Sequence, residues 1–411
     1  MKITIRPGTL KGSITPPASK SQGHRLLLAA ALAEGESVIT GLTMSRDIEA
    51  TVSCVCQLGA QVREEGDGLR VVGRGGKPGV NRGQTFDCGE SGSTLRFLIP
   101  ITLALLGGGS FVGHGRLMER PLQPYFDIFK EKDISYARFE DRAGLEGTLT
   151  PGEYKLPGNV SSQFITGLLY ALPLLDGDSR IRITTPLESL AYVDMTLDAL
   201  RRFGVTAGWE EEQVLLVPGK QSHRPANVAV EGDWSQAAFW YAARTLGSGV
   251  EVLGMDPDST QGDRVVASQA EQMARPGDVV LDVSQCPDLV PALAAMAAVR
   301  QGRTCIVNAA RLRIKESDRL AAVARVLGDM GADITEQEDG LTVVGLPELA
   351  GGVTVDSFHD HRIAMMAAVA ATRCVRPVTV AGAECVSKSY PGFWQDYQAL
   401  GGSLARNGEE L

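Results

Sequence analysis

The chain has 411 residues and a mass of 43.7 kDa, a length typical of roughly two to three domains. Hydrophobic residues make up 44% and charged residues 22% of it, so it can bury a sizeable core and is not a disordered chain. Its 40 Lys and Arg against 49 Asp and Glu give a formal charge of −9, which argues against a nucleic-acid-binding or membrane-surface protein with a general basic face. A locally positive cleft for small anions is still compatible with this charge.

Cysteine and histidine spacing argues against metal chemistry. The seven cysteines include no C-x-x-C pair, which disfavours a disulfide framework or a zinc site. The five histidines are scattered apart from His359 and His361, whose spacing is poor for two ligands, so we expect no metal and no cofactor. The N-terminal residues MKITIRPGTL show no signal or transit peptide, and apolar runs such as 98–106 are too short to cross a membrane. We therefore expect a cytoplasmic protein.

One kind of segment recurs six times: small polar residues followed by a run of Ala, Leu, Met and Phe that is typical of a buried helix. The copies are SKSQGHRLLLAAAL from Ser19, GESGSTLRFLIPITLAL from Gly89, VSSQFITGLLYALPLL from Val160, GDWSQAAFWYAARTL from Gly232, CPDLVPALAAMAAV from Cys286 and HDHRIAMMAAVAA from His359. Their starts are 70, 71, 72, 54 and 73 residues apart. This spacing predicts six units of one kind.

A second segment has the same period. It consists of a helix that ends at Gly, a strand, an acidic turn and another strand, and it begins near residues 58, 203 and 330, with a diverged copy from 133. Strands rich in Val, Ile and Thr lie between the two segments, for example at 179–184, 304–308 and 377–381. Each unit therefore has the plan βαβαββ, which predicts an α/β (α+β) fold with two domains of three units. A helical solenoid is the alternative, and the strands in every unit disfavour it.

The repeated helices all begin with side chains that form hydrogen bonds. A helix N-terminus presents unpaired N–H groups and roughly half a positive charge, so each start is a potential anion site. Ordinary capping by Ser or Asp explains one such start, but not the cations Lys20, Arg25 and Arg362 beside apolar runs. The charged segments GHGRLMERPL at 113–122 and RLRIKESDRL at 311–320 occupy the same place in their units. A solvated helix start explains either alone; together they indicate one cleft.

Several segments taken together resemble the 5-enolpyruvylshikimate-3-phosphate synthase family of enolpyruvyl transferases. They are PASKSQGHR, GESGSTLRFL, MERPL, NVSSQF, RIKESDR, DHRIAM and VSKSYPGF, and the resemblance runs from residue 2 to about residue 400. It implies a first domain of residues 19–225 and a second of residues 1–18 and 226–411, because the first strand of the family pairs with the C-terminal domain. It also implies an inverse α/β prism with a cleft between the domains, and a monomer.

The resemblance implies transfer of the enolpyruvyl (carboxyvinyl) group of phosphoenolpyruvate to the 5-hydroxyl of shikimate 3-phosphate, through a tetrahedral ketal phosphate and with release of phosphate. This reaction belongs to the shikimate pathway to chorismate and aromatic amino acids. Both substrates carry a phosphate and a carboxylate, so their mutual repulsion calls for several Arg and Lys side chains. The implied partners are these two substrates and the competitor glyphosate, with no nucleic acid and no membrane.

The resemblance also implies the site residues, position by position. Shikimate 3-phosphate is bound by Ser21, Arg25, Ser161, Ser162, Gln163, Ser189 and Tyr192. Phosphoenolpyruvate is bound by Lys20, Gly92, Arg120, Arg319, Arg362 and Lys388, with Gln163 near both ligands and Lys315 at their junction. Asp288 and Glu316 are the acid/base carboxylates, and Lys20 and Lys388 complete the catalytic set. The sequence leaves open which group performs which proton transfer.

Four positions need separate interpretation. Glu90 stands where many members of the family have Asn, so we expect its carboxylate to point away from the anion or to pair with an Arg. Phe97 replaces a frequent Pro, and Arg311 stands where some members have Asn. Asp233 matches a family aspartate that we interpret as structural.

Two alternative functions were weighed. A UDP-N-acetylglucosamine enolpyruvyl transferase typically has a Cys in the loop before its R-P motif and a K-N pair near the N-terminus; here the loop lacks Cys and Ser21 follows Lys20. A catalytically inactive anion-binding relative would have lost Lys20, Asp288 or Glu316, and all three are present.

Overall fold

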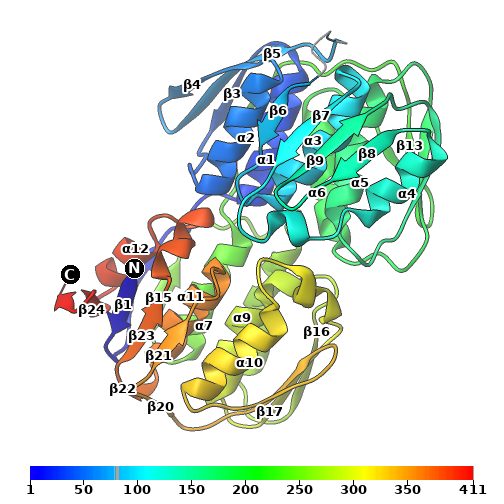
Figure 1. Cartoon of the computed structure of the whole chain (residues 1–411). Coiled ribbons are helices and arrows are strands. Elements are labelled where there is room, and N and C mark those ends of the chain that lie inside the picture. Colours follow the sequence, from blue (N-terminus) through cyan, green and yellow to red (C-terminus); the bar gives the residue numbers. More distant parts are fainter. Residues whose placement is uncertain (78, 80–82, 411) are drawn as a thin grey trace. The chain divides into compact units, whose positions relative to one another are not determined.

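The computed structural model describes residues 1–77, 79 and 83–410 (Figure 1). These residues divide into two compact units, Ala18–Glu231 and Met1–Pro17 with Gly232–Leu411. The expected domains differ from these units at residue 18 and at residues 226–231. The reason is that strand β14 (Asn227–Ala229) pairs with β3 (Glu34–Thr40), and Ala18 donates its backbone N–H to Thr43 Oγ1.

Unit Ala18–Glu231 contains three four-stranded mixed sheets with one plan: a parallel pair followed by two antiparallel neighbours. Their strand orders are β14-β3-β5-β4, β6-β7-β9-β8 and β10-β11-β13-β12. The further strands are β4 (Gln61–Glu65), β5 (Gly68–Arg74), β6 (Thr85–Asp87), β7 (Gly108–Val112), β8 (Ser135–Arg138), β9 (Arg142–Glu146), β10 (Gly152–Leu156), β11 (Ser179–Ile183), β12 (Gly208–Glu211) and β13 (Val214–Val217). The hairpins β4-β5, β8-β9 and β12-β13 confirm the second repeated segment, including its diverged copy.

Each sheet of this unit comes with two helices. The first helices are α1 (Lys20–Leu32), α3 (Gly92–Leu105) and α5 (Ser162–Ala171); the second are α2 (Arg46–Gln57), α4 (Gln123–Glu131) and α6 (Leu190–Arg202), with 3₁₀ turns η1 (Leu117–Glu119) and η2 (Leu172–Leu174). In α1, 11 of 13 residues are buried, whereas α2 buries only 4 of 12. The continuous apolar runs of the first helices therefore form the core. Their polar first turns carry side chains that we expect to bind the substrates.

Helices α3 and α5 approach closely at a glycine. A Cβ at Gly167 would lie 2.2 Å from Tyr125 Oη and 2.4 Å from the Arg96 carbonyl oxygen, so no larger residue fits. Pro100 has no N–H to donate to the Arg96 carbonyl one turn earlier. Tyr125 Oη donates to that carbonyl instead, at 2.7 Å, and also contacts the Phe164 carbonyl at 3.0 Å. These bonds fix α3 against α5 just below the turns that carry Gly92 and Gln163.

The other unit contains one four-stranded sheet of the same plan, a five-stranded sheet and two parallel pairs. Their orders are β16-β17-β19-β18, β21-β23-β1-β24-β25, β15-β2 and β20-β22. The strands are β1 (Lys2–Ile5), β2 (Lys11–Ile14), β15 (Gly249–Val252), β16 (Val279–Asp282), β17 (Arg303–Val307), β18 (Asp333–Glu336), β19 (Leu341–Val344), β20 (Leu349–Gly351), β21 (Thr354–Asp356), β22 (Cys374–Arg376), β23 (Val378–Ala381), β24 (Leu404–Arg406) and β25 (Glu409–Glu410). Strand β1 pairs with β23, with Lys2 opposite Ala381, so the first strand lies with the C-terminal sequence as expected.

The helices of this unit repeat the same order. The first helices are α7 (Trp234–Thr245), α9 (Val290–Val299) and α11 (His361–Ala371); the second are α8 (Val266–Met273), α10 (Arg319–Asp329) and α12 (Phe393–Ala399), with turns η3 (Gly262–Val265), η4 (Pro287–Leu289), η5 (Ala310–Ile314) and η6 (Ala383–Lys388). All six repeated segments thus contain a helix. In the α7 repeat, strand β15 pairs in parallel with β2 from the N-terminal segment, and the described residues form no final hairpin. The absent hairpin explains why this repeat spans 54 residues instead of about 70.

Candidate active site

The start of α1 presents an ion pair. Ser19 caps the helix by accepting from the Gln22 backbone N–H, and Lys20 is its first residue. Lys20 Nζ donates to Asp47 Oδ2 at 2.7 Å, from the first turn of α2. Both side chains are only partly buried, so the ammonium is held in place while it can still contact a ligand.

Arg25 of α1 is buried and connects α1 with α5 and α6, and its Nη2 donates to Thr166 Oγ1 of α5 at 3.3 Å. Its Nε donates to Thr196 Oγ1 at 2.8 Å, and its two Nη atoms donate to the carbonyls of Ser21 at 2.7 Å and Tyr192 at 3.0 Å. The guanidinium also lies 5.3 Å from the ring centroid of Phe97. Burial lowers the pKa of Arg25 to about 10, so the group is still charged at neutral pH. The structure thus brings the expected residues Ser21, Arg25 and Tyr192 together.

Gly92 and Arg120 are neighbours. Gly92 is the first residue of α3, and a Cβ there would lie 2.9 Å from Arg120 Nη1 and 3.0 Å from Arg120 Cζ. Arg120 ends the turn η1 and is buried. A glycine at 92 therefore lets a guanidinium approach the exposed N–H groups of a helix start, which is a favourable arrangement for an anion.

Gln163 lies in a polar cluster at the start of α5. Its Oε1 accepts from Arg96 Nη1 at 2.6 Å, and its Nε2 donates to Ser93 Oγ at 2.9 Å. Ser161 caps the same helix by accepting from the Gln163 backbone N–H at 3.3 Å. Gln163 is therefore oriented by α3, the helix that also carries Gly92.

The remaining residues expected to bind shikimate 3-phosphate lie at two helix starts. Ser162 is the first residue of α5, and Ser189 precedes α6. Ser189 is buried and has φ 56° and ψ 47°, a left-handed conformation that serine rarely adopts. The nearby packing must hold this conformation, since unusual backbone angles persist only where the surrounding structure fixes them.

In the other unit, one guanidinium holds three carboxylates. Arg319 donates from Nε to Asp360 Oδ2 at 2.9 Å, from Nη1 to Asp288 Oδ1 at 2.9 Å and from Nη2 to Glu316 Oε2 at 2.6 Å. Its side chain is 1% exposed. Burial opposes its charge, but Asp360, Glu316 and Asp288 raise the pKa of Arg319 above its usual value. A lysine at this position, with a single point charge, could not make these three hydrogen bonds at once.

The Asp288 carboxylate is in contact with three cationic side chains. Its Oδ2 accepts from Arg362 Nη2 at 3.2 Å, and its Oδ1 lies 3.7 Å from Lys315 Nζ in addition to the bond from Arg319. Burial raises the pKa of Asp288, but Arg362, Lys315 and Arg319 outweigh it and hold the pKa well below its usual range. The carboxylate is therefore ionised, and its basicity depends on how strongly these cations are engaged elsewhere.

Lys315 has an unusual acidity. Burial lowers its pKa to about 8, and the cations Arg311 and Arg319 act in the same direction, while Asp288 opposes them. An ammonium with a pKa near neutrality can both donate and accept a proton in a reaction cycle. Lys388, the other expected lysine, donates from Nζ to the His359 carbonyl at 2.7 Å.

The structure also shows the surroundings of the four positions discussed separately above, namely Glu90, Phe97, Arg311 and Asp233. A Cβ at Gly115 would lie 2.7 Å from Glu90 Oε2, which places the Glu90 carboxylate against the loop before η1. Phe97 is buried and meets the ring of His24 edge to face, with centroids 6.5 Å apart. Arg311 is buried in η5. Asp233 caps α7 by accepting from the backbone N–H groups of Ser235 and Gln236.

Three contributing residues were missed by sequence reasoning. Asp360 is fully buried and accepts from Ser317, from Arg319 and from the Arg362 backbone N–H; its place before His-Arg was a usable signal. Arg96 also had a signal, because a cation inside the apolar run of α3 needs partners. Asp47 had none, since it lies 27 residues from Lys20 with an ordinary helix-start pattern around it.

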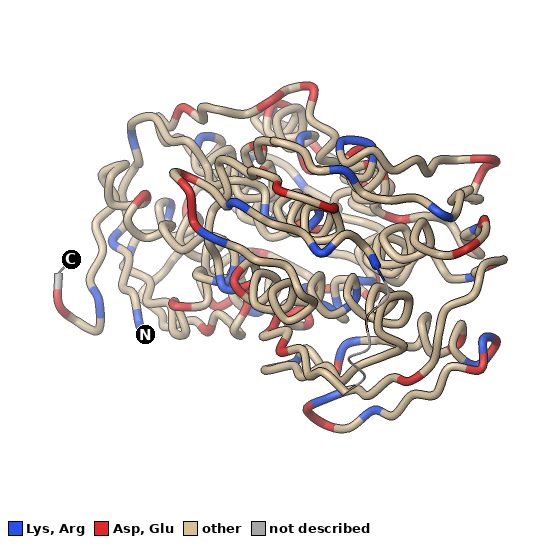
Figure 2. Tube along the Cα trace, turned by 90° about the horizontal axis from the view of Figure 1, so that it is seen from above, with Lys and Arg blue, Asp and Glu red and all other residues tan. Residues whose placement is uncertain are grey.

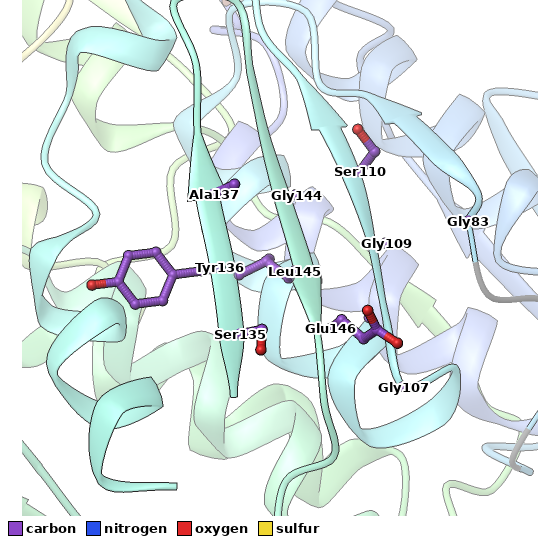
Figure 3. Close-up of a pocket in the computed structure, with 11 residues that line it drawn as sticks. Gly83, Gly107, Gly109, Ser110, Ser135, Tyr136, Ala137, Gly144, Leu145 and Glu146 are labelled. Atoms are coloured by element: carbon purple, nitrogen blue, oxygen red, sulfur yellow. The ribbon is translucent and has the colours of Figure 1, made fainter. Parts of the chain in front are cut away.

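Other features of the described residues do not suggest a second site. No group of three or more His, Cys, Asp or Glu side chains is arranged there to hold a metal ion, and no helix is long and apolar enough to cross a membrane. Acidic and basic residues are interspersed along the trace (Figure 2). A hollow of about 590 Å³ lies on the sheet of β7, β8 and β9, where Tyr136 points away from Ser110 and Glu146 (Figure 3). Glu146 is the only charged side chain among the described residues that line the hollow, and a carboxylate there does not favour an anionic ligand.

Comparisons with known proteins agree on one family. The model of the family EPSP synthase (3-phosphoshikimate 1-carboxyvinyltransferase) matches residues 5–397. The chain is 46% identical over 421 residues to a 3-phosphoshikimate 1-carboxyvinyltransferase of Clostridium perfringens, covering 98% of this chain and 99% of that protein. A solved EPSP synthase from Acinetobacter baumannii has a TM-score of 0.81 at 26% identity, covering 98% of this chain and 100% of that one. The enolpyruvyl transferase NikO from Streptomyces tendae shares the fold, with a TM-score of 0.79 at 16% identity over 98% of each chain.

The repeated α/β fold is that of an enolpyruvyl transferase. The chain belongs to the EPSP synthase (3-phosphoshikimate 1-carboxyvinyltransferase) family. It is a transferase of the shikimate pathway that joins the enolpyruvyl group of phosphoenolpyruvate to shikimate 3-phosphate.

Proposed function

We propose that two groups of residues carry out this transfer: the polar side chains at the starts of α1, α3, α5 and α6, and the charged side chains around Arg319. The observation that supports the proposal best is the group around Arg319, in which two carboxylates expected to act in catalysis, Asp288 and Glu316, share one buried guanidinium. Such a group can hold charge and move protons in the same place.

Shikimate 3-phosphate binds to the unit Ala18–Glu231. Ser161, Ser162 and Ser189 take its phosphate at the starts of α5 and α6, where backbone N–H groups favour anions. Ser21, Arg25, Gln163 and Tyr192 bind the rest of the molecule. Arg25 suits the carboxylate because it is charged, buried and already oriented by Thr166 of α5 and Thr196 of α6.

Phosphoenolpyruvate is bound by the residues that the family resemblance assigns to it: Lys20, Gly92, Arg120, Arg319, Arg362 and Lys388. The closeness of Arg120 to Gly92 supports an anion at the start of α3. Glyphosate, an anion slightly longer than phosphoenolpyruvate, is expected to compete for the same residues.

Catalysis proceeds by addition and elimination. The 5-hydroxyl of shikimate 3-phosphate loses a proton and its oxygen attacks C2 of phosphoenolpyruvate, while the methylene carbon gains a proton; the tetrahedral product then loses that proton and phosphate. Asp288 is a weak base while three cations hold it. An anionic substrate that engages Arg362 and Lys315 weakens this hold and raises the pKa of Asp288, so the base becomes active only when substrate is bound. Glu316 or Lys315 handles the methylene proton, with Lys20 and Lys388 stabilising the developing charge.

The test is release of inorganic phosphate with both substrates present. We expect phosphate release only when shikimate 3-phosphate and phosphoenolpyruvate are added together, and none when UDP-N-acetylglucosamine replaces the first. Double variants of Asp288 and Glu316 should bind shikimate 3-phosphate without releasing phosphate. Turnover in such a variant at the parent rate would contradict the assigned roles. We expect the enzyme to be a cytoplasmic monomer, and light scattering after size-exclusion chromatography measures the oligomeric state.

A further inference from the structure

Four buried polar side chains form a continuous chain of hydrogen bonds next to the start of α3. His24 Nδ1 lies 2.7 Å from Thr51 Oγ1, which lies 2.6 Å from Thr94 Oγ1. Thr94 Oγ1 then donates to Ser91 Oγ at 2.7 Å. The four residues come from α1, α2, α3 and the cap of α3, and none is more than 1% exposed. We refer to them below as the hydroxyl chain.

The hydrogen bonds of the hydroxyl chain all donate in the same direction, from His24 toward Ser91. Burial, reinforced by Lys20 and Arg25, lowers the pKa of His24 well below its usual value, so its ring is neutral. His24 Nε2 is buried without a hydrogen-bond partner among the described residues. An unpaired lone pair costs less than an unpaired N–H, so the hydrogen belongs on Nδ1, which donates to Thr51. Thr94 donates to Ser91, so Thr51 is the donor in its 2.6 Å contact with Thr94, and its hydrogen is shared with the Asp47 carbonyl at 3.3 Å.

Two members of the hydroxyl chain, Ser91 at one end and Thr51 within it, lie next to Gly92 and to the partner of Lys20, both assigned to phosphoenolpyruvate binding. Ser91 also accepts from the Thr94 backbone N–H at 3.2 Å, which makes it the cap immediately before Gly92. Thr51 Oγ1 lies 3.3 Å from the Asp47 carbonyl, and the Asp47 side chain holds Lys20 Nζ. Arg25, by contrast, donates to Thr166 of α5, to Thr196 and Tyr192 of α6 and to the Ser21 carbonyl, all outside the hydroxyl chain.

We propose that the hydroxyl chain His24–Thr51–Thr94–Ser91 positions Gly92 relative to Lys20, and thereby sets the affinity for phosphoenolpyruvate separately from that for shikimate 3-phosphate. Its members are positioning residues that touch neither substrate. The proposal rests on the proposed roles of Gly92 and Lys20. It predicts that removing one hydroxyl changes the binding of one substrate only.

The deciding variant is Thr94→Val, which keeps the volume of the side chain and removes both of its hydroxyl bonds. Loss of a buried hydrogen bond typically changes an equilibrium by about 10-fold. We expect KM for phosphoenolpyruvate to rise by about that factor, and Kd for shikimate 3-phosphate, measured by calorimetry, to stay within about twofold. Thr94→Ser, which keeps the hydroxyl, should restore KM. Thr51→Val should raise KM for phosphoenolpyruvate as Thr94→Val does. It replaces Thr94→Val in the experiment if that variant does not fold.

Thr102→Val is the matched control. Thr102 lies on the same helix, is fully buried and, among the described residues, donates its hydroxyl to the Ile99 carbonyl of its own helix alone. It should lower the melting temperature about as much as Thr94→Val and leave KM for phosphoenolpyruvate unchanged. Arg120→Ala, assayed in parallel, tests the proposed function itself by raising that KM.

Two results would overturn the positioning role. One is a KM for phosphoenolpyruvate in Thr94→Val no higher than in Thr102→Val while Arg120→Ala still raises it, which leaves the proposed function standing. The other is an equal loss of affinity for both substrates. If Arg120→Ala also leaves KM unchanged, the proposed function fails as well.

Discussion

Arg319 donates from Nη1 to Asp288 Oδ1 at 2.9 Å, and this bond joins the first turn of α10 to the turn before α9. The same guanidinium serves Glu316 and Asp360, so its planar fork fixes the relative positions of three carboxylates. A lysine keeps the charge but cannot make these three bonds. We expect Arg319→Lys to lower kcat/KM for phosphoenolpyruvate by a factor on the order of 10² or more. Arg325→Lys is the control, because Arg325 of the same helix is exposed and pairs with Asp329 at the surface. Equal losses in both variants in steady-state kinetics would remove Arg319 from the site.

Glu316 should be needed for turnover but not for binding. Its Oε2 accepts from Arg319 Nη2 at 2.6 Å, and an amide at this position can take the same place without accepting a proton. General acid/base groups typically contribute a factor of about 10² or more, so we expect Glu316→Gln to lower kcat by that amount with substrate Kd values nearly unchanged. Glu336→Gln, which alters the partner of Arg313, should keep full turnover. Near-normal kcat in Glu316→Gln would exclude a proton-transfer role.

The alkaline side of the pH profile should report on Lys315. Because its pKa is lowered to about 8, its ammonium loses the proton as pH rises through that value, and kcat/KM should fall there if the charged form is required. Arg311 is one of the cations that lower this pKa. Removing it in Arg311→Asn should therefore move the alkaline limb to higher pH, whereas Arg325→Asn should not. An alkaline limb that stays in place in Arg311→Asn would show that another group controls it.

Gly92→Ala should separate phosphoenolpyruvate from its longer competitor. The added Cβ would lie 2.9 Å from Arg120 Nη1, so the guanidinium must shift and the space at the start of α3 shrinks by a methyl group. We expect the inhibition constant of glyphosate to rise by a larger factor than KM for phosphoenolpyruvate. Gly208→Ala adds a methyl group that meets nothing within 4 Å and should change neither constant. Equal rises of both constants in Gly92→Ala would show that the extra length of the inhibitor does not lie at the start of α3, and an unchanged inhibition constant would place the inhibitor elsewhere.

His223 should make the fold less stable in mild acid. Burial lowers its pKa to about 4, while an exposed histidine in the unfolded chain titrates near 6.5. Between these values the unfolded chain binds a proton that the folded chain does not, so stability is full above pH 6.5 and falls by up to about 1.4 kcal/mol per pH unit as pH drops toward 4.

The variant His223→Phe removes this titration and keeps a ring near Tyr170, whose centroid is 6.3 Å away. Urea midpoints measured at pH 7 and pH 5 should differ less in His223→Phe than in the parent. His114→Phe, at an exposed position paired with Asp87, is the control and should keep a larger difference than His223→Phe. An unchanged difference in His223→Phe would mean that His223 is protonated in the folded state.

The sequence by itself determined the local pattern of this protein. The apolar runs with polar starts predicted six helices, and the Gly-strand-turn-strand segments predicted the hairpins β4-β5, β8-β9, β12-β13 and β18-β19. These features are readable because helix and hairpin periodicities are set by residues close together in the chain. The motifs from Lys20 to Lys388 also predicted the family, which the comparisons confirm.

Tertiary structure alone decided which side chains meet. Lys20 pairs with Asp47, Gly92 stands against Arg120, and Arg319 reaches carboxylates at residues 288, 316 and 360. Apart from the pair Arg319–Glu316, three residues apart, nothing local in the chain encodes these contacts, because they join helices and turns that lie 27 or more residues apart in the sequence. The depressed pKa of Lys315 follows from the same packing, since burial and neighbouring charges exist only once the chain has folded.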